Sequence, residues 1–509
     1  MNISGRILQL AALASLAAFG PRTQAEAVPN LTPPARIIQP ASVLGSHIQR
    51  TMTLLATSTP EHRNRVRILF YGQSITENVW WRETEDDLRR RFPNALLEVE
   101  NRAIGGFASN LLIKPAEHDV PAYYPDLVIF HVYGDHRKYE EIIRLIRSRT
   151  TSEVLIQNDH QTRWAAKTGV PKDGGEVWDD RMNRDIIPEI ASKFGCGLVD
   201  IRSSWTAYLE DNHLQPRDLL VDDVHLNPRG YSLMAAIVNS YLVYRPDLPR
   251  EEWQSLVRTF EVGSGVSWEK GRLTLHFEGN RIDAIAQRTA VKSEGLGHSA
   301  RVLIDGKKPS EIEGTHSITR PSPRPWSALA LIRVDHDRPL LAEDWTLTIT
   351  SFDPSPAKWS FRVEGSKTGS DGSGWSDAAF TSPSGRVRID PGSWFQKMPV
   401  EPGYRIRWSV VPMFTDVYRE AVSDDPSVEL STILAQGLPN GPHTLELVAE
   451  PGQTLELAAL RAFRPPFATT VFPTLLVASG TTTLVVAFGS ILAIRRARAR
   501  RGRRQEVAT

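Results

Sequence analysis

Between residues 65 and 248, five short apolar segments alternate with segments that have the apolar spacing of helices. The apolar segments are 66–70, 95–99, 127–132, 153–157 and 197–201, and the helical segments are 81–92, 139–147, 184–194 and 231–244. Strands that alternate with helices along a chain form parallel sheets whose two faces are covered by helices. This pattern predicts an α/β domain, a three-layer sandwich with a parallel sheet.

A serine follows the first of these strands, at a point where the chain turns. Ser74 stands there, and Asp222 precedes His225 by three residues far downstream. A serine hydroxyl becomes an effective nucleophile when an imidazole takes its proton and a carboxylate holds that imidazole in the right tautomer. Asn227 and Pro228 suit the N-cap and first position of a helix, which leaves His225 on a loop. The three side chains are candidates for one catalytic site.

The order and content of these segments resemble the SGNH, or GDSL-type, hydrolase family. Gly72-Gln73-Ser74-Ile75 matches the family's first sequence block, with Gln73 where the family usually has Asp, and Asp222 through His225 matches the last block. The resemblance covers about residues 65–248. It implies a flavodoxin-like sheet and a Ser-His-Asp esterase, lipase or carbohydrate deacetylase, with Ser74 as nucleophile, His225 as general base and Asp222 as its partner.

The family's middle blocks supply an oxyanion hole. Gly106 fits the glycine whose backbone N–H binds the oxyanion, but the block Gly-x-Asn-Asp is matched by Tyr133-Gly134-Asp135-His136, so the asparagine is replaced by Asp135 or, in another register, by His136. An ionised carboxylate would repel the oxyanion, and loss of one donor costs about 3 to 4 kcal/mol of transition-state stabilisation. Three routes are open: a protonated Asp135, a donor from His136, or backbone N–H groups of Ser74 and Gly106. We favour the last two.

Four further side chains follow the carboxyl ends of strands, where open α/β sheets bind ligands. Trp80 and Trp81 stand just past the serine, and Asn158 and His160 just past the fourth strand. The tryptophans are candidates for stacking on sugar rings or for core anchors, and the polar pair for substrate contacts or for turn formation. His131, within an apolar strand, is interpreted as a core histidine without a catalytic role.

From 249 to 466 the sequence changes to short strand-like segments separated by Gly, Pro, Ser and Asp, which predicts one all-β sandwich or jelly roll. Hairpin turns are expected at Asp305-Gly306 and Asn440-Gly441, and a flexible loop at 365–374. The segment 437–445 resembles jelly-roll modules that accompany carbohydrate-active enzymes. Two roles stay open, a rigid stalk or a glycan-binding module that uses exposed tryptophans among Trp359, Trp375 and Trp394.

Both ends of the chain have patterns typical of membrane targeting. Residues 1–27, with a basic residue, an apolar run and an A-x-A site, predict a signal peptide, and the proline-rich 28–64 predicts an extended lead-in. Residues 467–494 contain no charge and predict a transmembrane helix, and 495–509 form a basic tail that would stay cytoplasmic. The catalytic and β domains are then expected outside the cytoplasm. Removal of the apolar segment by processing stays an alternative.

The overall composition argues against some classes of partner and cofactor. The 509 residues carry 60 Lys and Arg against 59 Asp and Glu, a balance that argues against nucleic acid as a partner. The single cysteine, Cys196, is interpreted as a core residue, and no Cys and His cluster indicates a metal, so no cofactor is predicted.

The prediction is a membrane-anchored extracytoplasmic serine esterase that removes acyl groups, foremost O-acetyl, from carbohydrate. Two alternatives stay open. The same acyl-enzyme supports an O-acyltransferase, and the missing asparagine fits a surface glycan-binding protein with an impaired hydrolase domain.

Overall fold

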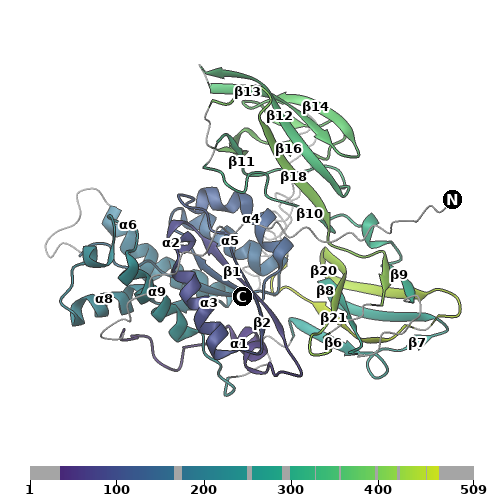
Figure 1. The fold of residues 1–509 in the computed structure, drawn as a ribbon, viewed down its shortest axis with the longest axis horizontal. Helices are drawn as coiled ribbons and strands as arrows, with labels where there is room; N and C mark the ends of the chain where they lie inside the picture. The colour runs from purple at the N-terminus through teal and green to yellow at the C-terminus, as the bar shows by residue number, and fades with distance from the viewer. Residues whose placement is uncertain are drawn as a thin grey trace, which may run out of the picture. The chain divides into compact units, whose positions relative to one another are not determined.

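The structure is a computed structural model that describes residues 35–164, 175–248, 255–288, 298–326, 328–354, 357–395, 399–420, 425–453 and 455–468. These residues form an α/β domain followed by two β modules (Figure 1).

A five-stranded parallel sheet forms the centre of the α/β domain. Its strands are β1 (Arg65–Gly72), β2 (Leu96–Asn101), β3 (Leu127–His131), β4 (Glu153–Gln157) and β5 (Gly197–Val199). The strand order is β2-β1-β3-β4-β5, and all four neighbouring pairs are parallel. This is the flavodoxin-like order, so the predicted sheet and its five strands are confirmed.

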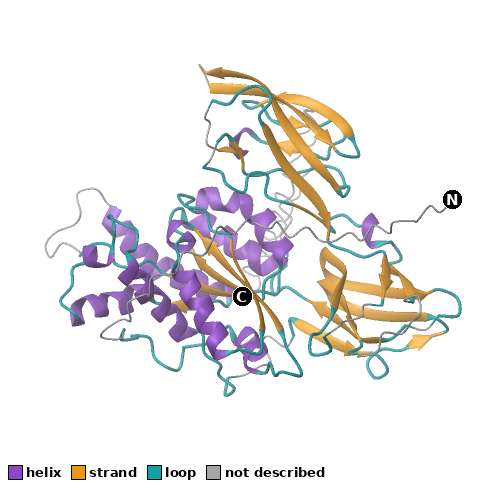
Figure 2. Ribbon diagram, viewed as in Figure 1, coloured by secondary structure: helices purple, strands orange, loops and turns teal. Residues whose placement is uncertain are grey.

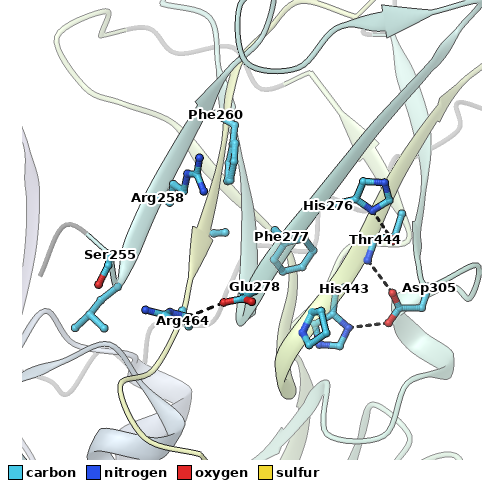
Figure 3. Close-up of a pocket in the computed structure, with 13 residues that line it drawn as sticks. Ser255, Arg258, Phe260, His276, Phe277, Glu278, Asp305, His443, Thr444 and Arg464 are labelled. Atoms are coloured by element: carbon cyan, nitrogen blue, oxygen red, sulfur yellow. Dashed lines mark hydrogen bonds and ion pairs between the residues drawn. The ribbon is translucent and has the colours of Figure 1, made fainter. Parts of the chain in front are cut away.

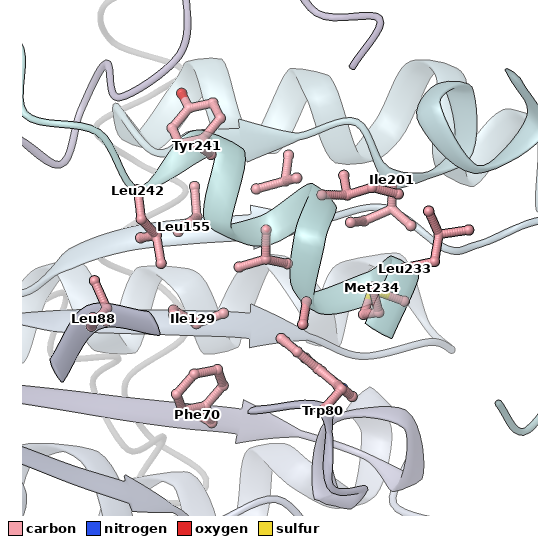
Figure 4. Packing of buried hydrophobic residues seen from close by; sticks show 14 of the residues in the cluster. Phe70, Trp80, Leu88, Ile129, Leu155, Ile201, Leu233, Met234, Tyr241 and Leu242 are labelled. Carbon is pink, nitrogen blue, oxygen red and sulfur yellow. The ribbon is translucent and has the colours of Figure 1, made fainter. Parts of the chain in front are cut away.

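Helices cover both faces of this sheet (Figure 2). One face carries α1 (Gln49–Ala56), α3 (Trp80–Arg91), α8 (Ile201–Asp211) and α9 (Pro228–Tyr241), and the other carries α4 (Ser109–Tyr123), α5 (His136–Arg149) and α7 (Ile187–Phe194). Short helical segments are α2 (Ser74–Glu77), α6 (Gly175–Arg181), the π-helix η1 (Met182–Ile186) and the 3₁₀ helix η2 (Pro216–Leu219). Side chains of β1 alternate between the two cores: Ile68 and Phe70 face α9, and Leu69 and Tyr71 face α4. Figure 4 shows the first core, where α9 lies over the strands.

The helices that were not predicted include α1, α4 and α8. Pro115 and Pro121 lie inside α4, where proline normally disfavours a helix. Residues 28–64 were predicted as an extended lead-in, and this is wrong for the described part, because α1 places Ile48, Met52 and Leu55 in the first core. The α/β domain therefore begins before residue 65.

Two β modules are present, where the sequence predicted one sandwich. The first, which we call the split module, comprises β6 (Val257–Glu261), β7 (Trp268–Glu269), β8 (Arg272–Ala286), β9 (Ser299–Ile304), β19 (Val417–Arg419), β20 (Ser431–Ala449) and β21 (Leu457–Phe463) in one seven-stranded sheet. The second, the inserted module, lies in the chain between β9 and β19. Each module has a hydrophobic core of its own.

The inserted module contains a five-stranded antiparallel sheet of order β10-β18-β12-β13-β14 and two small sheets. Its strands are β10 (His316–Ile318), β11 (Ala330–Leu331), β12 (Glu343–Pro354), β13 (Ala357–Gly365), β14 (Gly369–Trp375), β15 (Phe380–Thr381), β16 (Arg388–Ile389), β17 (Trp394–Phe395) and β18 (Arg405–Pro412). Short 3₁₀ helices are η3 (Pro309–Glu311) and η4 (Pro391–Ser393).

Several local predictions in the β region can be compared with the structure. The Asp305-Gly306 turn is confirmed, since both residues have positive φ and Ile304 pairs with Lys307. The predicted Asn440-Gly441 hairpin is wrong, because β20 continues through it with a register shift. The predicted loop 365–374 is also wrong, because most of it forms β14, where the buried Asp371 accepts hydrogen bonds from Ser384.

The predicted signal peptide at 1–27 lies outside the described residues, as does the predicted transmembrane segment from 469 onward and the basic tail. Within the described part of the chain, every helix is too short or too polar to span a membrane.

Candidate active site

The nucleophile candidate stands where β1 meets α2. Gln73 donates its backbone N–H to the His131 carbonyl over 3.3 Å, and Ser74 opens α2. A Cβ atom on Gly72 would lie only 2.0 Å from the same carbonyl oxygen. Glycine is therefore required just before the turn, because β1 and β3 approach too closely for any side chain. The turn places half-buried Ser74 at the carboxyl edge of the sheet.

The loop between η2 and α9 is held in shape by its own carboxylate. Asp222 Oδ1 accepts the backbone N–H groups of Val224 at 2.8 Å and His225 at 2.7 Å. Asn227 caps α9 by accepting the Gly230 N–H at 3.0 Å, as the sequence predicted. This local turn explains the three-residue spacing, since it directs the second carboxylate oxygen at the histidine ring.

The structure brings the three candidate catalytic side chains together. His225 Nε2 lies 3.0 Å from Ser74 Oγ, and His225 Nδ1 lies 2.8 Å from Asp222 Oδ2. In the tautomer that donates Nδ1–H to the carboxylate, Nε2 accepts the serine hydroxyl proton. A hydrogen-bond relay of this geometry can activate a serine as a nucleophile.

The relay is open to water and its carboxylate is ionised. The side chain of His225 is 39% exposed and that of Asp222 is 54% exposed. The hydrogen bonds from the backbone and the ring of His225, and from the backbone of Val224, lower the pKa of Asp222 to about 2. Asp222 therefore carries its negative charge throughout the physiological pH range.

The glycine loop after β2 lies beside the serine. A Cβ atom on Gly105 would lie 3.8 Å from Ser74 Cβ. The Gly105 N–H donates to Glu77 Oε2 at 2.9 Å, and Gly106 has a φ of +73°. Within the described residues, the backbone N–H groups of Ser74 and Gly106 have no hydrogen-bond acceptor. These two N–H groups are the available donors for an oxyanion.

Asp135 has a structural role, and its predicted place in the oxyanion hole is not supported. Its Oδ1 accepts the backbone N–H groups of Arg137 and Lys138 at 2.9 Å each, so it is the N-cap of α5. These bonds, with that of Lys138 foremost, lower the pKa of Asp135 on an exposed side chain. A protonated Asp135 is therefore ruled out as a donor, because the cap favours the ionised carboxylate.

His136 does not meet the serine either. Its ring packs on Trp178, with ring centroids 5.3 Å apart. Within the described residues, no hydrogen bond joins it to Ser74 or Gly106. Of the three routes that the sequence left open, the structure supports the backbone route.

Of the two tryptophans after the serine, Trp80 lies in the protein interior and Trp81 lies at the edge of that interior. Trp80 is fully buried, donates its indole N–H to the Ile75 carbonyl at 2.6 Å and packs edge-on against Phe70 (Figure 4). Trp81 is half-buried, packs against Phe70 and lies beneath the guanidinium of Arg82. Their prediction as a sugar platform is wrong for Trp80 and unsupported for Trp81.

Asn158 and His160 are buried and hold the architecture behind the site. The amide of Asn158 donates to Asp200 and accepts from the Arg202 N–H. His160 Nε2 lies 2.9 Å from the Val224 carbonyl oxygen, directly before His225. Burial lowers the pKa of His160 to about 4, so the ring is neutral and its Nε2–H donates. Their predicted substrate contact is wrong, since both are 5% exposed or less.

Two predictions about interior residues are confirmed. His131 is 2% exposed and its Nε2 lies 2.6 Å from Asp159 Oδ1. Cys196 is buried among apolar side chains, which raises its pKa to about 12. Within the described residues, no group of three or more His, Cys, Asp or Glu side chains is arranged for a metal.

Two residues beside the serine were missed. Glu77, at the end of α2, accepts the Gly105 N–H, and this contact joins residues that are 28 positions apart in the chain. Trp326 lies over the glycine loop and donates its indole N–H to the Gly105 carbonyl at 2.5 Å. It comes from the inserted module, and no spacing along the chain links it to the serine.

A separate cavity of about 580 Å³ lies on the split module and contains none of the catalytic candidates (Figure 3). Two of its carboxylates are paired: Asp305 lies 2.7 Å from His443 Nδ1, and Glu278 lies 3.4 Å from Arg464. The cavity is a groove on the surface of the β sheet. Its lining residues lie between 255 and 464, outside the segment of the chain that contains Ser74, Asp222 and His225.

The comparisons with known proteins agree with the α/β assignment. Residues 70–233 match the model of the family described as GDSL-like Lipase/Acylhydrolase. None of the curated proteins compared with the chain matches it.

Several solved structures are similar to the chain at low identity. One is a two-domain esterase (CEX) active on acetylated mannans, 15% identical, covering 84% of this chain and 98% of that one, with a TM-score of 0.33. Another is the acetylxylan esterase Axe2 from Geobacillus stearothermophilus, 19% identical over 37% of this chain and 98% of that one, with a TM-score of 0.31. A third is LAE5, an α/β hydrolase from the metagenome of Lake Arreo, Spain, 19% identical over 35% and 94%, with a TM-score of 0.29.

These identities and TM-scores are low, so the assignment depends on the family match and on the sheet order. Both concern the same segment of the chain, and that segment also contains Ser74, Gly106, Asp222 and His225. Residues 70–233 thus form a hydrolase domain of the GDSL-like lipase/acylhydrolase type.

Proposed function

We propose that the protein is a serine esterase that works through an acyl-enzyme on Ser74. The observation that carries this proposal is the unbroken relay from Ser74 Oγ to His225 at 3.0 Å and from His225 to Asp222 at 2.8 Å. A serine with this environment can form and then release an acyl ester.

In the first half-reaction, Ser74 Oγ attacks the ester carbonyl carbon while His225 Nε2 takes the hydroxyl proton. The carbonyl oxygen becomes an oxyanion that the N–H groups of Ser74 and Gly106 stabilise. The intermediate collapses as the C–O bond to the alcohol breaks, and the imidazolium gives its proton to the leaving alcohol. Asp222 stabilises the imidazolium throughout.

In the second half-reaction, His225 Nε2 takes a proton from water while the water oxygen attacks the acyl carbonyl carbon, which forms a second oxyanion. This intermediate collapses as the bond from the acyl carbon to Ser74 Oγ breaks, the imidazolium returns its proton to Ser74 Oγ, and the carboxylic acid leaves. The exposure of the His225 and Asp222 side chains supports water as the acceptor, because solvent reaches the imidazole directly. Transfer of the acyl group to a sugar hydroxyl would require a site that excludes water. Hydrolysis is therefore the proposed reaction.

The proposed substrate is an O-acetylated carbohydrate outside the cytoplasm. Support for the carbohydrate comes from the resemblance of the Ser74 and His225 segments to a family that includes carbohydrate deacetylases. Support for the location comes from the sequence of 1–27 and from the uncharged run 467–494 followed by arginines. Exposure of the catalytic domain to added protease on intact cells, compared with lysed cells, tests the location.

The catalytic proposal is tested with Ser74→Ala and His225→Ala in the full-length protein. Removal of a relay member is expected to lower kcat for a chromogenic acetate ester about 10⁴-fold or more. Fluorophosphonate labelling should disappear in Ser74→Ala. Ser240→Ala, which changes a hydroxyl bonded within α9, is the matched control and should be labelled normally. A Ser74→Ala protein with wild-type turnover would refute the mechanism, and product analysis with an added glycan acceptor would reveal transfer.

A further inference from the structure

A proline-rich arm of the inserted module reaches the α/β domain. Residues 319–326 read Thr-Arg-Pro-Ser-Pro-Arg-Pro-Trp, with a proline at every second position from 321 to 325. Each proline restricts its own φ and also the conformation of the residue before it. The arm is therefore a stiff spacer between β10 and β11, and it ends in Trp326.

The arm is fixed to the α/β domain near its start. Arg320 forms an ion pair with Asp119 of α4 through two of its nitrogens, Nε at 3.0 Å, and it also donates to the Arg102 carbonyl at 3.0 Å. Asp119 is 4% exposed in its side chain, and it also accepts the Tyr71 hydroxyl at 3.1 Å. A buried, bidentate pair with further hydrogen bonds sets the position of the arm.

Trp326 then packs at the edge of the serine site. Its ring meets Phe107 edge-on at 6.3 Å and Phe395 edge-on at 4.7 Å, so aromatic rings from both domains hold it. A Cβ atom on Gly106 would lie 2.6 Å from Trp326 Cζ2. The indole therefore lies directly on the glycine that offers the oxyanion donor.

The indole N–H is also bonded to the same peptide group as that donor. Trp326 donates to the carbonyl oxygen of Gly105 at 2.5 Å, and the N–H of Gly106 belongs to that peptide plane. Glu77 holds the preceding N–H, on Gly105. In a trans peptide the C=O and N–H point in opposite directions, so a bond to the oxygen determines where the Gly106 N–H points.

Despite these contacts, the Trp326 side chain is 48% exposed. Most other large aromatic side chains of the inserted module, such as Trp359 and Trp394, are buried in its core. An indole whose polar N–H is satisfied and whose ring is half exposed presents apolar surface on the Gly105–Gly106 loop, which lies next to Ser74. Flat apolar rings of this kind match the C–H face of a pyranose.

We propose that Trp326 is a substrate-positioning residue of the esterase, contributed by the inserted module. Its exposed ring binds the sugar that carries the ester, while its N–H holds the Gly105–Gly106 peptide in the orientation that directs the Gly106 N–H at the oxyanion. The inference rests on the proposed esterase function and adds to it the residue that binds the sugar ring and the module that contributes this residue.

The test compares two acetate esters in the full-length protein. Ethyl acetate has no ring to stack, whereas an acetylated sugar has at least one. The sugar ester used is the one that the wild type hydrolyses best in a panel that includes acetylated xylo-oligosaccharides and glucose pentaacetate. Trp326→Ala is expected to lower kcat/KM for the sugar ester about tenfold more than for ethyl acetate, mainly through KM. Trp326→Phe, which keeps a ring but loses the N–H, should lower kcat for both esters by a similar factor.

Leu341→Ala is the matched control, because Leu341 is an apolar side chain of the same module, is 44% exposed and should leave both reactions unchanged. If Trp326→Ala does not fold, Trp326→Leu keeps an apolar contact with Phe107 and Phe395 and removes the flat ring. In Trp326→Ala, or in Trp326→Leu if that variant replaces it, equal losses for both esters or no loss for the sugar ester would overturn the inference. So would a wild type that hydrolyses ethyl acetate and none of the sugars. A wild type that hydrolyses neither ester would refute the esterase itself.

Discussion

At the scale of single residues, close backbone contacts and buried hydrogen bonds explain most of the site. Gly72 lets β1 pass the His131 carbonyl, Asp222 shapes its own loop, and His160 holds the carbonyl next to His225. Each of these roles is local in space and concerns one or two atoms. Two of them give predictions that a single substitution tests.

Gly72→Ala is expected to destabilise the protein by about 3 kcal/mol or more, because the new Cβ would lie 2.0 Å from a backbone oxygen that cannot move freely. Gly271→Ala is the matched control. Gly271 has a φ of +78°, and a Cβ atom added there would have no atom within 4 Å, so only backbone strain of about 1 kcal/mol is expected. Thermal unfolding of the two variants checks the difference, and equal shifts in Tm would contradict it.

His160 predicts a dependence of stability on pH. Burial lowers the folded-state pKa of His160 to about 4, against about 6.5 in the unfolded chain. The unfolded state therefore binds a proton between these values and the folded state does not, so stability is lost as pH falls from about 6.5 to about 4. The full loss is about 3 kcal/mol, at 1.36 kcal/mol per pKa unit.

His160→Gln keeps a donor for the Val224 carbonyl and does not titrate, so its unfolding free energy should change less over this range. Urea unfolding of both proteins at pH 7, 5.5 and 4.5 is the measurement. Parallel curves for wild type and variant would show that His160 is not the group responsible.

At the scale of elements, the start of α5 decides what Asp135 does. The Asp135 carboxylate caps α5 by accepting two backbone N–H groups. This role stabilises the fold and does not require the side chain to donate a hydrogen bond to an oxyanion. A family motif position has here become a capping position. The missing asparagine therefore does not by itself imply an inactive enzyme.

Asp135→Asn is expected to leave kcat unchanged within about twofold, because Asn is as good an N-cap as Asp and the donors for the oxyanion are backbone groups. Asp135→Ala should lower the unfolding free energy by about 1 kcal/mol through loss of the cap. Ester hydrolysis and thermal unfolding measure the two effects. A tenfold or larger rise in kcat for Asp135→Asn would show that the amide restores an oxyanion donor.

At the scale of the whole molecule, α4 is the surface to which the inserted module attaches. Asp119 pairs with Arg320, Lys114 Nζ donates to the Gly392 carbonyl, and the Val334 N–H donates to His118 Nε2 at 3.3 Å. Burial lowers the pKa of His118, which keeps its ring neutral and its Nε2 free to accept. The buried pair is the strongest of these contacts.

Asp119→Asn should lower the unfolding free energy by about 3 to 5 kcal/mol, because it leaves the Arg320 guanidinium buried without a counter-charge. Asp247→Asn breaks the pair with Arg245 in a side chain that is 61% exposed and should have little effect. Chemical unfolding compares them. Since Arg320 anchors the arm, Asp119→Asn should also lower kcat/KM for the sugar ester more than for ethyl acetate.

Much of the α/β domain could be predicted because its signals are local. A buried parallel strand is a short apolar run, and a surface helix has a period of 3.6 residues, so β1, β4 and α9 are visible in the sequence. The three-residue spacing of Asp222 and His225 is also local, because one turn creates it. The two prolines inside α4 kept this segment from being predicted as a helix. The strand-like pattern of the β region did not show that its strands belong to two separate modules.

The sequence by itself determined the parallel sheet, part of its two helical layers and the candidates Ser74, Asp222 and His225, because hydrophobic period and turn chemistry act over a few residues. Only the tertiary structure decided that Trp80, Asn158 and His160 are buried and that Asp135 is a cap. It alone also placed Trp326 on Gly106, 220 residues earlier in the chain. Contacts of that kind depend on how separate cores pack, and no local pattern records them.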